Sequence, residues 1–131
     1  MLAILFFSLG HDHSFAVTLA DLEWRYRLLF VSATSDERGE KIVSVLQREK
    51  AEVKDRELLW IVFINDKHET NQPKELDKEF LDEALASLNK SNSMDQEQTV
   101  IIGFDGQVKA RDTQFDFDQI KSIIDSMPMR R

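Results

Sequence analysis

Residues 57–65 read ELLWIVFIN, in which seven consecutive apolar residues, Leu58 to Ile64, stand between polar ends. A run this short and this continuously apolar is typical of a strand that is covered on both faces. Such strands occur in sheets that carry helices on either side. The stretch therefore predicts a domain of the α/β class.

A strand and a helix are predicted upstream of this stretch. The apolar run RLLFVSA, residues 27–33, predicts another buried strand. Helical spacing of apolar residues then predicts a helix over residues 36–49. Gly39 lies in its first turn and should loosen it, because glycine costs up to about 1 kcal/mol relative to alanine inside a helix.

A loop and a second helix are predicted downstream. Residues 66–74, DKHETNQPK, have the composition of a polar loop. A clean amphipathic pattern starts at Leu76 and predicts a helix. A polar linker, NKSNSMDQEQ, follows over residues 89–98. The apolar side of this helix contains Phe80, Leu81, Ala84, Leu85 and Leu88.

The last third of the chain predicts a hairpin and a third helix. In TVIIGFDGQVKARDT, residues 99–113, two strand-like runs flank Asp105-Gly106, a pair typical of a type I′ turn. Asp116 has the spacing of a helix cap with Gln119. The helix after it should stop at Pro128. Its apolar stripe is Phe117, Ile120, Ile123, Ile124 and Met127.

These elements follow the order β-α-β-α-β-β-α. Right-handed crossovers make the first two strands parallel neighbours, and the hairpin supplies an antiparallel pair. The first and third helices should cover one face of the sheet and the second helix the other. The predicted fold is thus α/β and thioredoxin-like, with a four-stranded mixed sheet and helices on both faces.

Composition narrows the classes of function. The chain has 131 residues, a net charge of -7 and no cysteine. Its length fits one domain. The negative charge argues against general binding of nucleic acid or of anionic membranes, which need a cationic field. The lack of cysteine excludes disulfides, thiol catalysis and cysteine-ligated metal.

The first residues predict a signal peptide. MLAILFFSLG is an apolar run of the length of a signal-peptide core, too short to span a bilayer. Ser14 and Ala16 are small residues at the two positions that a signal peptidase reads, so cleavage is predicted after Ala16. The segment before the core contains no lysine or arginine, and a buried N-terminal strand is the alternative. The prediction is a signal peptide over residues 1–16, a domain over residues 17–131, periplasmic or secreted localisation and no stable membrane insertion after cleavage.

The junction SATSDERGE, residues 32–40, lies where a thioredoxin carries its reactive cysteines. Thioredoxin chemistry needs a thiolate at a helix N-terminus, and a serine hydroxyl cannot replace it without a positioned base. The residues before the third strand, 95–98, also lack the proline that forms the usual cis bond of this fold. Thiol-disulfide exchange is therefore excluded.

Two interpretations of the junction remain. Thr34 and Ser35 could hold an anion at the free N–H groups of the helix, helped by Arg38. Against this, Asp36 and Glu37 already place negative charge at the same helix end. The spacing of Thr34 and Glu37 is that of a capping box, and a helix cap is the favoured interpretation.

Other charged residues suggest weaker sites. Asp125, Arg130 and Arg131 could lie together after the last helix, and the arginines could bind a carboxylate or phosphate. Alternatively, the arginines only complement the helix dipole. Lys109 and Arg111 alternate on the last strand and would discourage pairing if that strand lies at a sheet edge.

A metal site is also conceivable at the N-terminus. His11-Asp12-His13 could ligate a metal, but these residues lie in the predicted signal peptide and no further ligand is suitably spaced. No metal and no cofactor is expected.

The chain resembles the thioredoxin-like family called domain of unknown function 4174 over roughly residues 19–131. The resemblance lies in LEWRYRLLFVSA, DRELLWIVF, IIGFDGQVKAR and above all the closing IIDSMPMRR. Phe104 departs from the lysine expected there. The resemblance implies small exported bacterial proteins of unknown activity, with similar domains in secreted sushi-repeat-containing matrix proteins. A role in binding matrix polyanions would transfer poorly to so acidic a chain.

The sequence favours a non-catalytic, exported binding or interaction domain that acts on an unknown protein or small molecule. The alternative is an enzyme with a non-thiol site at the junction or around Lys109 and Arg130. A third hypothesis is an adhesion factor that works through Arg130 and Arg131. The candidate binding residues are Thr34, Ser35, Arg38, Lys109, Asp125, Arg130 and Arg131.

Overall fold

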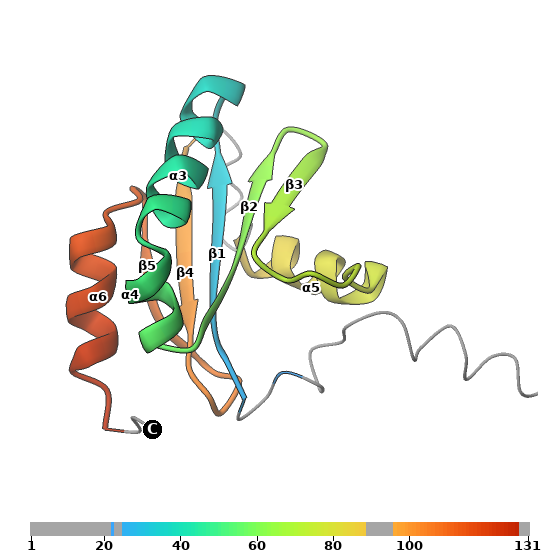
Figure 1. The fold of residues 1–131 in the computed structure, drawn as a ribbon. Coiled ribbons are helices and arrows are strands. Elements are labelled where there is room, and N and C mark those ends of the chain that lie inside the picture. Colours follow the sequence, from blue (N-terminus) through green and yellow to red (C-terminus); the bar gives the residue numbers. More distant parts are fainter. Residues whose placement is uncertain (1–21, 23–24, 89–95, 129–131) are drawn as a thin grey trace, which may run out of the picture.

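The structure is a computed structural model that describes residues 22, 25–88 and 96–128. A five-stranded mixed sheet with the order β3-β2-β1-β4-β5 forms its centre (Figure 1). The strands are β1 (Arg27–Ala33), β2 (Leu58–Ile64), β3 (Lys67–Thr70), β4 (Gln98–Ile102) and β5 (Val108–Asp112). The helices are α3 (Asp36–Arg48), α4 (Lys50–Asp55), α5 (Lys78–Leu88) and α6 (Phe117–Asp125).

The parallel pair at the centre of the sheet agrees with the prediction. Strands β1 and β2 are parallel, and Arg27 is opposite Leu58. Strand β4 is antiparallel to β1, with Gln98 opposite Ser32 and Ile102 opposite Leu28. The seven residues of β2 are all buried, as their apolar run predicts, and the five residues of β4 are buried as well. The hairpin of β4 and β5 places β5 at one edge of the sheet.

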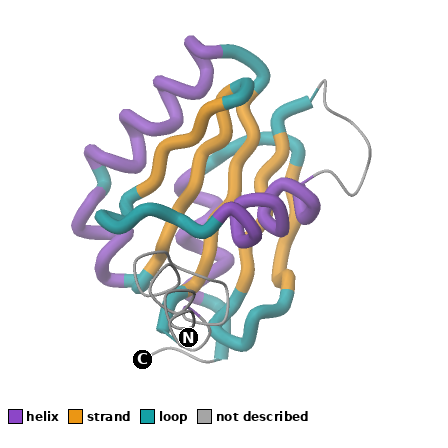
Figure 2. The backbone as a smooth tube through the Cα atoms, turned by 90° about the vertical axis from the view of Figure 1, so that its right-hand side faces the viewer, coloured by secondary structure: helices purple, strands orange, loops and turns teal. Residues whose placement is uncertain are grey.

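The helices form two layers, as predicted from their apolar faces. One core layer joins α3, α4 and α6 to the sheet through buried residues that include Leu46, Val53 and Ile124. The other joins α5 to the opposite face through residues that include Phe80 and Leu88. Figure 2 shows α5 crossing in front of the strands, with the other helices behind the sheet.

The four-strand prediction is wrong, because residues 67–70 form β3 and do not belong to a loop. This short strand pairs antiparallel with β2 from Ile61 to Ile64. Asn65 begins the connecting turn with a φ of 57°, in the left-handed region that asparagine tolerates. No residue of β3 is buried, so the strand lacks the apolar alternation by which a strand is recognised in a sequence.

The hairpin prediction is right but its turn type is wrong. A type I′ turn needs a positive φ at both central residues. At this hairpin only Gly106 has a positive φ, 81°, whereas Asp105 does not. The Gly106 N–H donates to the Gly103 carbonyl at 3.0 Å, so the turn closes over Phe104 and Asp105 before the glycine.

The helix predicted over residues 36–49 is present as α3. The chain leaves helical geometry at Glu49, whose φ and ψ are -95° and 32°, and a short helix that was not predicted, α4, follows. Gly39 is buried, and a Cβ built on it would lie 2.5 Å from Cγ1 of Ile64. The glycine therefore brings α3 close to β2, a role that the expectation of a loosened turn did not include.

Candidate functional site

The strand-to-helix junction is an ordinary helix start. Ser35 is the N-cap of α3, and its Oγ accepts a hydrogen bond from the Arg38 N–H at 3.1 Å. The prediction that Thr34 caps the helix is therefore wrong by one residue. Thr34 and Ser35 are both exposed. The Asn65 side chain donates to Oδ1 of Asp36 at 2.7 Å and ties the turn after β2 to the same helix end.

Arg38 is paired with Glu97, a residue that the sequence did not single out. Its Nε lies 2.7 Å from Oε1 of Glu97 and its Nη2 lies 3.1 Å from Oε2. The backbone N–H of Phe115 donates to the same carboxylate, and the Phe115 carbonyl accepts from Arg38 at 3.4 Å. This cluster joins α3 to the segments before β4 and before α6.

The pKa of Glu97 is lowered in this environment. Burial alone would raise the pKa of the carboxyl group, but hydrogen bonds from Arg38 and from the Phe115 N–H outweigh it and lower the pKa. The hydrogen bond to Glu97 in turn raises the pKa of Arg38. Glu97 therefore binds the Arg38 guanidinium, the group that an anion at the junction would need.

Lys109 lies on β5 and pairs with Asp105 across the hairpin, with Nζ 2.9 Å from Oδ2. The hydrogen bond from Lys109 lowers the pKa of Asp105. Arg111 instead reaches α5, where its Nη1 donates to the Ser87 carbonyl at 2.6 Å. Strand β5 lies at the sheet edge, which is the position that Lys109 and Arg111 need if they are to discourage pairing with another strand.

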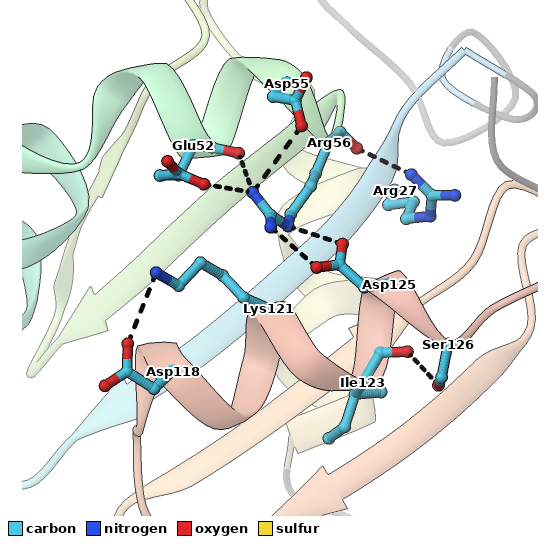
Figure 3. Close-up of polar contacts among 9 residues, drawn as sticks. All are labelled: Arg27, Glu52, Asp55, Arg56, Asp118, Lys121, Ile123, Asp125 and Ser126. Atoms are coloured by element: carbon cyan, nitrogen blue, oxygen red, sulfur yellow. Dashed lines mark hydrogen bonds and ion pairs between the residues drawn. The ribbon is translucent and has the colours of Figure 1, made fainter.

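Asp125 is held by Arg56, which precedes β2. Nε and Nη2 of Arg56 donate to the two carboxylate oxygens of Asp125, at 3.1 and 2.9 Å (Figure 3). The Nη1 atom donates to Oε1 of Glu52 at 2.7 Å. The hydrogen bond to Asp125 is the main reason that the pKa of Arg56 is raised. Arg130 and Arg131, the predicted partners of Asp125, lie outside the described residues.

The described candidate residues occupy opposite ends of the sheet. Thr34, Ser35 and Arg38 lie at the carboxyl end of β1. The hairpin of Lys109 lies at the other end, because β4 is antiparallel to β1. Arg56 is at that end too, because it precedes β2, whose first residue pairs with Arg27. The structure does not assemble Thr34, Ser35, Arg38, Lys109 and Asp125 into one site.

A groove of about 820 Å³ lies elsewhere, along the outer edge of β2. One wall comes from α3 and α4, and the other from the chain that follows β3. The buried side chains of Leu46, Val53 and Trp60 contribute to its lining, and Lys50 and Lys54 stand exposed beside it. Sequence reasoning missed this groove, since its residues come from several distant segments of the chain.

Asn71 closes part of this groove. Its Nδ2 donates to the Leu58 carbonyl and its Oδ1 accepts from the Trp60 N–H, both at 3.0 Å. A side-chain amide thus makes the two hydrogen bonds to β2 that the main chain of a neighbouring strand would make. Asn71 itself is exposed.

In the described part of the chain, no helix has the length and apolarity needed to cross a membrane. The predicted signal peptide and His11-Asp12-His13 lie outside that part. Within it, no three metal-ligating side chains of histidine, cysteine, aspartate or glutamate are grouped in a way that could hold a metal ion.

A comparison with protein families matches residues 18–131 to the family described as Domain of unknown function (DUF4174). Neither the curated proteins nor the solved structures contain a match to this chain.

Proposed function

The chain belongs to the DUF4174 family, and from that premise we propose that it is a non-catalytic, thioredoxin-like binding domain. The parallel pair β1–β2 joined through α3, followed by an antiparallel hairpin and α6, supports the thioredoxin-like part of the proposal. The binding surface in this proposal is the groove along β2.

The observation that carries the proposal is that the charged candidate residues form ion pairs with other residues of the same domain. Arg38 binds Glu97, Lys109 binds Asp105 and Asp125 binds Arg56. A catalytic site needs a nucleophile, a base or an electrostatic group directed at a common point. These pairs are directed at one another, and they lie at two ends of the sheet.

The enzyme alternative has weaker support for the same reason. It requires the junction, or Lys109 with Arg130, to present reactive groups to a substrate. The Ser35 hydroxyl accepts from a backbone N–H and caps a helix, and the Lys109 ammonium group is bound to a carboxylate. Neither arrangement activates a nucleophile.

Export is a further part of the proposal, and it rests on the apolar segment at the start of the chain. Expression of the full chain in a bacterium and N-terminal sequencing of the protein outside the cytoplasm tests it. The expected first residue is Val17. An uncleaved protein that stays in the cytoplasm would contradict this part alone.

Site-specific crosslinking tests the binding proposal. A photo-crosslinking residue at Gln47, on the groove, is compared with one at Glu40, which is exposed on the same helix but does not line the groove. The expected result is one discrete partner captured from position 47 and not from position 40, whose binding is reproduced with purified components. Equal capture at both positions, or capture at neither, speaks against a binding groove.

Catalysis is tested separately on the purified protein with panels of esterase, phosphatase and glycosidase substrates. A turnover that survives purification and disappears in Ser35→Ala or Lys109→Ala, while the variant stays folded at the assay temperature, would overturn the proposal. The proposal predicts no such turnover.

A further inference from the structure

Among the described residues, strand pairing covers only half of the outer edge of β2. Strand β3 pairs with Ile61 to Ile64, and Leu58 to Trp60 extend beyond it. An uncovered strand edge presents backbone N–H and C=O groups to any chain that can align with it. This uncovered half of β2 lies in the groove described above.

Pro73 explains why β3 does not continue along that edge. The pairing of Ile61 with Thr70, extended by three residues, would set Pro73 opposite Leu58. Proline has no N–H to donate to a strand ladder. The Leu58 carbonyl would then lack its donor, and the Asn71 side chain supplies one instead.

Asn71 therefore acts as a stand-in for one peptide group of a missing strand. Its amide has the same donor and acceptor as a backbone peptide, and it bonds the Leu58 carbonyl and the Trp60 N–H at 3.0 Å each. Because Asn71 is exposed, the side chain can swing into water without moving the core. The backbone groups at this edge of β2 therefore have hydrogen-bond partners in the free protein, and the edge can still accept a strand.

The walls of the groove indicate what kind of chain would fit. Buried apolar side chains, Trp60 among them, contribute to the lining and suit alternate apolar residues of an extended chain. Lys50 and Lys54, four residues apart on α4, are exposed, and no carboxylate among the described residues lies within 4.0 Å of either. Glu57 also lines the groove, which leaves an excess of one positive charge over these three residues.

We propose that this groove binds an extended polypeptide segment that carries apolar and acidic residues on the same face, which pairs as an added strand with Leu58–Trp60 and displaces the Asn71 amide. The proposal rests on the proposed binding function and names the class of partner. A free small anion would satisfy the two lysines but would leave the strand edge to Asn71. An acidic polypeptide segment satisfies both, because its carboxylates can face the lysines while its main chain pairs with the edge.

A defined peptide tests the proposal. The probe is a blocked heptapeptide, Val-Ser-Glu-Ser-Val-Ser-Glu, whose valine and glutamate side chains share one face of a strand. It is added to the isotopically labelled full domain and followed by NMR. Its controls are the same peptide N-methylated at every residue, which cannot donate to a strand, and a valine–lysine peptide of opposite charge. The expected result is that only the first peptide shifts the backbone amide signals of Leu58 and Trp60 and the side-chain amide signal of Asn71.

Three variants make the test specific. Asn71→Ala removes the side chain that competes with the peptide for the β2 edge. Peptide binding should tighten about tenfold, because the two hydrogen bonds of Asn71 no longer have to be broken. Lys50→Glu with Lys54→Glu should weaken it roughly fivefold or more. Lys41→Glu with Lys78→Glu, a charge-matched control at exposed positions outside the groove, should change it less than about twofold.

Several outcomes would overturn the proposal. Equal binding of the N-methylated peptide rules out strand pairing, and shifts confined to other surfaces rule out this groove. No binding to either the wild type or Asn71→Ala at about 1 mM peptide rules out an accessible edge. None of these results affects the crosslinking test at Gln47, so a binding domain with another mode of recognition would still be distinguished from a domain that binds nothing.

Discussion

Arg56 and Asp125 form a two-point ion pair between residues 69 positions apart in the sequence. The arginine side chain is 9% exposed and the aspartate 46%. Arg56 is the C-cap of α4 and Asp125 is the last residue of α6. The pair therefore fastens α4 to α6 at one end of the sheet (Figure 3).

Asp125→Asn should lower the free energy of unfolding by about 1–2 kcal/mol, since it removes the charge of one partner and leaves a largely buried guanidinium with Glu52 and, at 4.0 Å, Asp55. Chemical denaturation measures the change. The matched control is Asp118→Asn on the same helix, because Asp118 is 94% exposed and lies 3.5 Å from Lys121. This control should change stability by less than about 0.5 kcal/mol. Equal effects of the two substitutions would contradict a structural role for the Arg56 pair.

Glu97 should give the protein a pH-dependent contribution to stability. Its pKa is lowered in the folded state, so the unfolded state binds more protons at this group. The contribution is therefore complete above the ordinary pKa of a glutamate and is lost as the pH falls through the folded value. Glu97→Gln should cost about 1–3 kcal/mol at pH 7, and less at about pH 3.

The measurement is denaturant unfolding of wild type and Glu97→Gln at several pH values. Only the difference between the two proteins isolates this carboxylate from the others. Glu75→Gln, at an exposed position, is the control whose effect should stay small at each pH. A cost of Glu97→Gln that grows towards low pH has the wrong sign and would refute the assigned pKa direction.

Gly39→Ala should destabilise the protein by about 1–3 kcal/mol, although alanine favours a helix by up to about 1 kcal/mol. The reason is the close approach of α3 to β2, where a new Cβ would lie 2.5 and 2.6 Å from Cγ1 and Cδ1 of Ile64. Thermal unfolding measures the loss. Adding Ile64→Val removes Cδ1 and should recover part of it. A stabilising Gly39→Ala would mean that helix propensity outweighs packing here.

Phe104→Lys should destabilise the protein by about 2–4 kcal/mol. The guanidinium carbon of Arg27 lies 4.2 Å from the centre of the Phe104 ring, and both residues are buried. Lysine at this position would bring a second cation beside a buried arginine and remove a favourable ring contact. Phe104→Leu keeps the site apolar and should cost less. If both substitutions cost the same, charge is not the reason that phenylalanine stands here.

The layers of the fold could be predicted from the sequence, because the apolar runs of β1, β2 and β4 and the helical stripes determine which faces are buried. Strand β3 could not, since its four residues, Lys67–Thr70, carry no apolar alternation and pair only because a tight turn returns them to β2. The sequence predicted that the junction is a cap but chose Thr34 over Ser35, two neighbouring hydroxyl residues with similar capping preference.

The partners of the candidate charges could not be predicted for a different reason. Arg38 meets Glu97 across 59 residues, and Asp125 meets Arg56 across 69. No spacing rule connects residues so far apart. Asn71 is a similar case, because its role depends on where β3 stops and on the missing N–H of Pro73.

The position of β1 has a consequence for the order in which the domain folds. Its neighbour β2 arrives after a single helical crossover, whereas its other neighbour, β4, pairs Ser32 with Gln98. Closing the longer loop costs more chain entropy, and non-local pairing of this kind slows folding. We therefore expect the segment from β1 to β3 to form an early nucleus, onto which β4, β5 and α6 dock late. In native-state hydrogen exchange, α6 should open at a lower free energy than β2.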